Sequence, residues 1–274
     1  MRLYIRHTTR YGFSQPVTHG LQRLRLTPKS SQGQSVIDWA MDFEGVKLEA
    51  EHDDHHRNRT TLVSVVPGTT AVTVVCSGSV DTAENADKAG IVGEHVGHLP
   101  LWCFLGQTTL TKPGPRLRAL VAGLDADRER PLEVLHRLSD AVLAAVPYAT
   151  GATDAETTAE GALFAGQGVC QDHTHIFIGA ARLLGLPARY VSGYLMMDGR
   201  VDQEAGHGWA EAHVAGLGWV GFDVSNAICP DERYVRLATG TDYRDAAPVT
   251  GLNIGGGQID LEVSLAVEQQ MIEQ

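Results

Sequence analysis

The feature that most constrains this 274-residue chain is the segment GQGVCQDHTHIFIGAARLLGLP, residues 166–187. Its apolar residues from Ile176 to Leu184 surround the helix axis instead of forming one stripe, which is typical of a helix buried on all sides. Gly185 and Pro187 end this helix, because glycine readily takes the left-handed conformation that closes a helix and proline cannot continue one. The rest of the fold must therefore cover it.

Strand patterns follow the buried helix. The segments ARYVSGYLMM, HGWAEAHV and WVGFDVS, which begin at residues 188, 207 and 219, each have the composition of a strand. An amphipathic helix, PLEVLHRLSDAVLAAV, precedes them and begins at Pro131. Helices followed by a sheet predict an α+β domain, which we place at residues 131–257.

The first 110 residues have a different character. Alternating or β-branched segments, such as LYIRH at 3–7 and AVTVVCS at 71–77, are separated by turn-rich stretches such as EHDDHHRNR at 51–59. Short strands at this spacing are typical of an antiparallel sandwich. We therefore predict an all-β sandwich over residues 1–110 and a linker over 111–130, which contains TKPGPR. Residues 258–274 form a separate C-terminal segment that alternates from Ile259 to Val267, so we expect a strand that could return to the N-terminal sheet.

The net charge of −11 argues against nucleic acid or an anionic membrane as partner, because both would repel the chain at long range. No run of 18 apolar residues occurs, and the first 15 residues lack the apolar stretch of a signal peptide, so we expect a cytoplasmic protein. The four cysteines have no paired spacing. Free thiols are therefore expected, without a zinc ribbon or a disulfide framework.

One cluster could bind a metal ion. His52, Asp53, Asp54, His55 and His56 supply imidazole and carboxylate groups, which are good metal ligands. No further ligand is fixed by spacing, so we interpret the cluster as a solvated loop between strands. We predict neither a metal nor any other cofactor.

Cys170 stands where the buried helix begins, after the flexible turn Gly166-Gln167-Gly168. The positive end of the helix dipole and the unpaired amides of the first turn favour a thiolate there. The same amides could donate to the oxyanion that forms when a thiolate attacks a carbonyl. The alternative is a small buried cysteine at a crowded helix start, since free cysteine is among the most buried residue types.

A cysteine nucleophile needs a base and a group that orients the base. His207 opens the segment HGWAEAHV, and Asp223 lies in WVGFDVS. If the hairpin between them turns about Gly216, position 223 lies opposite 209, and His207 and Asp223 are diagonal neighbours on one face. A two-residue turn would place them on opposite faces.

The runs GVCQDHTHIFIGAARLLGLPARYVSGYL and HGWAEAHVAGLGWVGFDVSN resemble the transglutaminase-like superfamily of bacterial cysteine enzymes. In that family's pattern the nucleophile lies in G-V-C-x-D, the base in H-x-W and the acid in G-W-x-x-x-D, and these positions match Cys170, His207 and Asp223. The stretches LYIRHTTRYGFSQPV and LRLTP are similar to the β-sandwich region that precedes the catalytic domain in such proteins.

The resemblance implies a papain/transglutaminase-like catalytic domain, with the cysteine on a buried helix packed against an antiparallel sheet. Two departures stand beside the triad: Gly208 replaces a common alanine, and Val224-Ser225 replaces Pro-Thr. Asp172 matches the family's acidic residue two positions after the nucleophile. We interpret it as a structural residue that orients the helix start.

The resemblance also implies a reaction in which Cys170 attacks a peptide, isopeptide or amide carbonyl of a peptide or protein substrate and forms a thioester. Water would complete a hydrolysis, which we favour, whereas an amine would complete a protein crosslink. Gln167 and Tyr148 are candidates for the second oxyanion donor. A non-catalytic binding module that docks partners on the sandwich is the remaining alternative.

Overall fold

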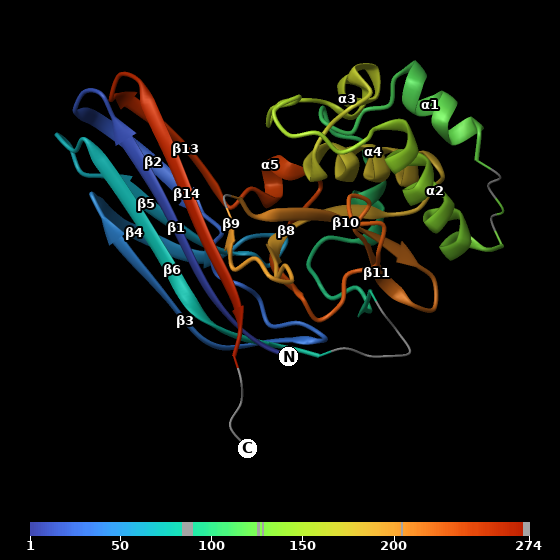
Figure 1. Ribbon diagram of the computed structural model, residues 1–274, viewed down its shortest axis with the longest axis horizontal. Helices are drawn as coiled ribbons and strands as arrows, with labels where there is room; N and C mark the ends of the chain where they lie inside the picture. The colour runs from blue at the N-terminus through green and yellow to red at the C-terminus, as the bar shows by residue number, and fades with distance from the viewer. Residues whose placement is uncertain (84–89, 125–126, 128, 204, 271–274) are drawn as a thin grey trace.

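The computed structural model describes residues 1–83, 90–124, 127, 129–203 and 205–270, which form two lobes (Figure 1). One lobe consists of strands, and the other places helices against an antiparallel sheet. The predicted α+β class, with a sandwich before a helix-and-sheet domain, is confirmed. None of the helices in the described ranges is long and apolar enough to cross a membrane.

The first lobe, called here the sandwich lobe, packs two antiparallel sheets together. Its strands are β1 (Arg2–Phe13), β2 (Val17–Leu24), β3 (Gln34–Glu44), β4 (Val46–Asp53), β5 (Arg59–Val65), β6 (Ala71–Thr82), β9 (Asp202–Gln203), β13 (Val249–Gly255) and β14 (Ile259–Gln269). One sheet has the order β3-β6-β1-β14-β9 and the other β13-β2-β5-β4. Buried side chains from both sheets, such as Ile5, Val74 and Val63, share one core. The long strands of the first sheet also extend along the second lobe (Figure 1).

The second lobe, called here the helical lobe, is built around α4. Its helices are η1 (Leu101–Leu105), α1 (Pro115–Ala122), α2 (Pro131–Ala145), α3 (Ala159–Ala165), α4 (Cys170–Leu183) and α5 (Tyr243–Ala246). Its strands are β7 (Ile91–Gly93), β8 (Ala188–Leu195), β10 (His207–Val214), β11 (Gly218–Phe222) and β12 (Tyr234–Gly240), in the order β12-β8-β10-β11-β7. All residues of α4 from 172 to 182 are buried, as the apolar pattern around its axis predicts.

The segment 111–130 is not simply a linker, because α1 lies within it. Pro115 takes the first helical position, where its missing N–H is no loss. The carboxylate of Glu160 accepts hydrogen bonds from the N–H groups of Gly114, Arg116 and Leu117 at 2.8–3.2 Å. Leu117 is fully buried against the α4 core. The Pro-Gly-Pro sequence indicated a linker, whereas a distant carboxylate caps a helix there.

The two lobes also exchange strands across the predicted boundary at residue 110. β7 lies before this boundary but pairs with β11 of the helical lobe. β9 and β13 lie within 131–257 but pair with β14 and β2 of the sandwich lobe. These pairings cover strand edges that would otherwise expose unpaired backbone groups. The C-terminal β14 pairs with β1 along its whole length, from Leu3 opposite Gln269 to Phe13 opposite Ile259.

A smaller correction concerns the turn predicted at residues 51–59. β4 continues to Asp53, and Glu51 lies opposite Thr61 in the ladder with β5. The Glu51 carboxylate accepts hydrogen bonds from Arg59 at 3.1 Å and from Thr61 at 3.2 Å. Residues 51–53 therefore belong to strand β4, where Glu51 is paired across the sheet, and the turn begins only after Asp53.

A buried ionic cluster holds together the strands that carry the site. Glu211 on β10 is fully buried and accepts hydrogen bonds from Arg189 on β8 and Arg236 on β12, both at 2.7 Å. Two guanidinium groups compensate the desolvation of this carboxylate. The cluster ties β10 to its neighbour β8 and to β12 on the far side of β8, four residues along from His207.

Candidate active site

Cys170 is the first residue of α4 and is half-buried. The start of the helix is fixed by Asp172, whose carboxylate accepts the N–H of Val169 at 2.8 Å and the hydroxyl of Thr153 at 2.6 Å. Asp172 is 1 % exposed and serves as the structural residue that the sequence indicates. Because Asp172 spans the helix start, the side chain of Cys170 is held at the end where the dipole is positive.

His207 and Asp223 meet as the hairpin argument predicts. The pairing of Val214 with Gly218 centres the turn on Gly216, which has a φ of 82°. This odd-numbered loop keeps His207 and Asp223 on one face of the sheet. The Nε2 atom of His207 lies 2.6 Å from Oδ2 of Asp223.

Asp223 is 1 % exposed and has two further hydrogen-bond partners. It accepts from Nδ2 of Asn226 and from the hydroxyl of Tyr234, both at 2.7 Å. The sequence pattern predicts neither partner. The Asn226 contact is local and follows from the turn after β11, but Tyr234 reaches Asp223 from β12, and no spacing indicates that contact.

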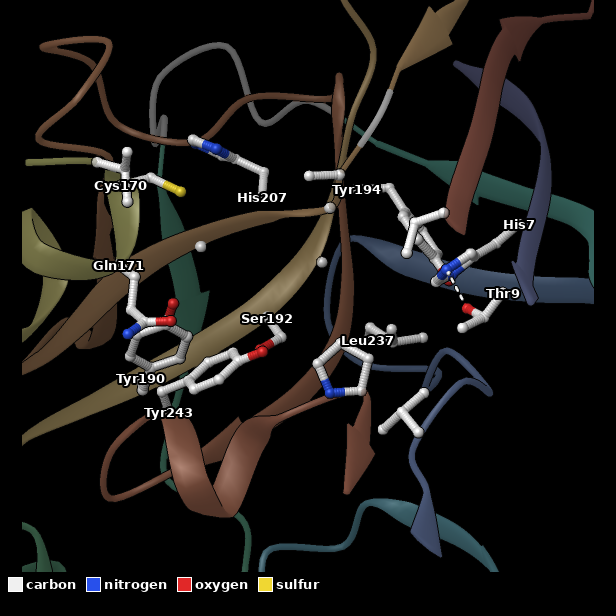
Figure 2. Close-up of a pocket in the computed structure, with 18 of the residues that line it drawn as sticks. His7, Thr9, Cys170, Gln171, Tyr190, Ser192, Tyr194, His207, Leu237 and Tyr243 are labelled. Atoms are coloured by element: carbon white, nitrogen blue, oxygen red, sulfur yellow. Dashed lines mark hydrogen bonds between the residues drawn. The ribbon is translucent and has the colours of Figure 1, made fainter. Parts of the chain in front are cut away.

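The sulfur of Cys170 points toward His207 in Figure 2, so α4 and β10 bring thiol and imidazole together. Burial opposes a charge on His207, but its hydrogen bonds to Asp223 and Cys170 outweigh burial and raise its pKa to about 10. Burial would likewise raise the pKa of Asp223, but the contact with His207 lowers it. At neutral pH the site therefore contains an imidazolium held by a carboxylate and facing a sulfur.

The two candidates for the second oxyanion donor are placed differently. Tyr148 is 52 % exposed, and its pKa is raised by partial burial and by the negative charges of Cys170 and Asp223, so it lies within electrostatic reach of the site. Gln167 is exposed on the turn before α4. The backbone of this turn is held by Ala149, whose N–H donates to the carbonyl of Gly168 at 2.7 Å.

His173, one turn into α4, joins the helix to the loop that follows β11. Its Nε2 lies 2.6 Å from the carbonyl oxygen of Val146, and its Nδ1 lies 2.8 Å from the hydroxyl of Ser225. A carbonyl can only accept, so Nε2 carries the proton and Nδ1 accepts from Ser225. Burial lowers the pKa of His173, which keeps it neutral. The hydroxyl of Ser225 therefore holds the loop of Asp223 against α4.

The His52–His56 cluster is divided by the structure. Asp54 is a structural residue that accepts from Arg25 at 3.1 Å and from the N–H groups of His56 and Asn58 at 2.9 Å. His55 and His56 instead approach Asp245 of α5, and the potential ligand atoms of these three residues lie within 4.8 Å of one another.

Comparison with known proteins adds family and fold. The family model of the transglutaminase-like superfamily matches residues 118–224. The family model of the bacterial transglutaminase-like N-terminal region matches residues 3–81. A protein from Cytophaga hutchinsonii, described as a candidate cysteine protease, has a similar structure, with a TM-score of 0.73, 21 % identity, and coverage of 100 % of this chain and 92 % of that one.

Two mycobacterial proteins are similar along nearly their whole length. An uncharacterized protein of Mycobacterium leprae is 26 % identical over 275 residues, which is 97 % of this chain and 98 % of that protein. One of Mycobacterium tuberculosis is 27 % identical over 298 residues, which is 96 % of this chain and 92 % of that protein. The resemblance thus extends over both lobes.

Proposed function

We propose that this chain, whose residues 118–224 match the transglutaminase-like superfamily, is a cysteine-dependent enzyme that attacks a peptide, isopeptide or amide carbonyl through a thioester at Cys170. The observation that carries the proposal is the contact between His207 and Asp223 at 2.6 Å, with His207 facing the sulfur of Cys170 (Figure 2). A base oriented by a buried carboxylate and adjacent to a thiol is the arrangement that nucleophilic catalysis needs.

In the proposed first step, the thiolate of Cys170 forms a bond to the substrate carbonyl carbon, and the electron pair moves to oxygen. The imidazolium of His207 donates its proton to the leaving nitrogen, so the C–N bond breaks and a free amine departs. Neutral His207 then removes a proton from water, which attacks the thioester. A carboxylic acid and the original thiolate–imidazolium pair result.

The oxyanion of each step needs hydrogen-bond donors close to the sulfur. The first-turn amides of α4 point to that region because Cys170 is the first residue of the helix. As the second donor we propose the hydroxyl of Tyr148 in preference to Gln167. The position of Tyr148 supports this choice, because Tyr148 pairs with Gly168, two residues before Cys170, and its ring centroid lies 6.1 Å from that of His173 on α4.

We propose water, not an amine, as the acceptor that resolves the thioester. Cys170 is half-buried and the side chain of His207 is 11 % exposed, so neither residue is sealed from solvent. Amine transfer is favoured by a site that excludes water from the thioester. Protein crosslinking is therefore the second candidate.

Product analysis distinguishes these reactions. The protein is incubated in ¹⁸O-labelled water with a mixture of peptides, some bearing glutamine, and a fluorescent primary amine, and the peptides are then analysed by mass spectrometry. We expect ¹⁸O in newly formed carboxyl groups and little fluorescent product. Fluorescent peptides without ¹⁸O would show amine transfer, as in crosslinking, instead of hydrolysis. Unchanged peptides would favour the non-catalytic binding module.

A further inference from the structure

A pocket of about 320 Å³ opens beside Cys170 and His207, between the two lobes. The helical lobe supplies one side of it through β8, β10 and α5. The opposite side belongs to β1 and β14 of the sandwich lobe. In Figure 2, Cys170 and His207 lie at one end of the pocket, with His7 and Thr9 at the other. The sandwich lobe thus faces the reacting atoms across a space the size of a ligand site.

Strand alternation directs one row of sandwich-lobe side chains into this pocket. His7, Thr9 and Tyr11 are two residues apart on β1 and share a face. Their cross-strand partners on β14 include Val263, opposite Thr9, and Leu261, opposite Tyr11. All five line the pocket. Leu261 is also 55 % exposed, which places an apolar side chain where the pocket meets solvent.

The pocket wall is uncharged apart from the Cys170–His207 pair. Among the lining residues that the structure describes, none is Asp, Glu, Lys or Arg. Burial lowers the pKa of His7 to about 4, so His7 is neutral at pH 7. Its ring nitrogens already have partners, the hydroxyl of Tyr194 at 2.9 Å and that of Thr9 at 3.1 Å. A charged side chain entering this pocket would lose water and meet no counter-ion in the described lining other than the Cys170–His207 pair, in which the imidazolium already faces the sulfur.

Gly208 gives one side of the pocket its shape. A Cβ atom at this position would lie 2.3 Å from the hydroxyl oxygen of Tyr190, which no real contact allows. Glycine beside His207 therefore lets the phenol of Tyr190 occupy the space next to the site. This explains physically why glycine stands where the family commonly has alanine. The aromatic rings of Tyr190 and Tyr243, whose centroids are 5.7 Å apart, form an apolar side wall.

We propose that this pocket binds an uncharged, mainly apolar side chain of the acyl donor, next to the carbonyl that Cys170 attacks, and that β1 and β14 select it. The inference rests on the proposed function of Cys170 and specifies its substrate. The pocket is at the small end of the range for ligand sites, so it accepts one side chain and not a folded segment.

The test uses three peptide vinyl sulfones that differ only in the residue next to the electrophile: phenylalanine, lysine or aspartate. The rate at which each alkylates Cys170 is measured by intact-protein mass spectrometry and divided by the rate with iodoacetamide. We expect the phenylalanine probe to react at least about tenfold faster than either charged probe, because the pocket offers a charge no partner.

Two matched variants place the selectivity on the sandwich lobe. Val263→Asp puts a carboxylate on the pocket face of β14, and Ser264→Asp puts one on the opposite, exposed face of the same strand. The first should remove the preference for phenylalanine and favour the lysine probe, whereas the second should retain the parental order. If Val263→Asp does not fold, Val263→Thr keeps the shape and should still weaken the preference, because it adds a hydroxyl.

The experiment distinguishes an error in the proposed pocket from an error in the proposed nucleophile. Equal rates for all three probes, with rapid reaction of iodoacetamide at Cys170, would overturn the pocket and leave the nucleophile intact. If folded Val263→Asp keeps the parental preference for the phenylalanine probe, β14 does not select the side chain, and the nucleophile is unaffected. No reaction of Cys170 with iodoacetamide would overturn the proposed function, and the pocket inference with it.

Discussion

Replacing Cys170 by alanine should abolish turnover while changing the melting temperature little. Cys170 is half-buried at a helix start, so its sulfur contributes little to packing. Without the sulfur no thioester can form, and a loss of at least about 10⁴-fold is expected from a nucleophile that acts as one unit with its base. The measurements are hydrolysis of a peptide or amide substrate and thermal unfolding of the same preparation.

Cys76 offers a matched control for this substitution. It is fully buried in the core of the sandwich lobe, so Cys76→Ala should destabilise the protein by about 1 kcal/mol and leave turnover per folded molecule unchanged. The opposite pattern would contradict the account. If Cys170→Ala melts like a core deletion and keeps its activity, Cys170 is structural and the binding-module alternative is favoured.

Asp223→Asn should lower the rate by about 10²–10⁴-fold and leave the shape of the site intact. Asp223 accepts hydrogen bonds from three residues, His207, Asn226 and Tyr234. An asparagine keeps the size but loses the charge that favours the imidazolium. The pKa of His207, raised to about 10 in the parent, should therefore fall. Since the imidazolium donates a proton to the leaving amine, the alkaline limb of the pH–rate profile should move to lower pH.

Tyr234→Phe is the control for this variant, because it removes one donor to Asp223 and keeps the carboxylate. It should cost only about tenfold in rate, which corresponds to one hydrogen bond to a charged group. The profile should remain close to the parental one. An Asp223→Asn protein with the parental rate and an unmoved alkaline limb would show that Asp223 does not act through His207.

The parts of the site that the sequence predicts are those set by local periodicity. The all-round apolar pattern locates α4 and puts Cys170 at its start. The glycine at 216 and the strand pattern around it predict a turn that places His207 and Asp223 on one face. Both features depend only on neighbours along the chain or across one hairpin, and for this reason the sequence predicts them.

The features that the sequence does not reveal depend on contacts between distant segments. Tyr234 reaches Asp223 from another strand, and Glu160 caps a helix more than 40 residues earlier in the chain. The pocket wall at Thr9 and Val263 forms because β14 returns to β1. No periodicity in either strand indicates which lobe its buried face will meet. The strand exchange between the lobes is hidden for the same reason, since β7 and β9 have only three and two residues.

The central claim, that Cys170 is an activated nucleophile, is tested most directly by iodoacetamide alkylation at pH 6, with the site of modification mapped by mass spectrometry. Burial raises the pKa of Cys76 to about 12 and also raises that of Cys229, so both should remain unmodified. The half-buried Cys103 serves as the reference thiol. We predict that Cys170 is modified first, at least about tenfold faster than Cys103, because an imidazolium and a helix N-terminus favour its reactive form. His207→Ala should remove this difference in rate. Modification of Cys170 no faster than Cys103, in parent and variant alike, would contradict the account.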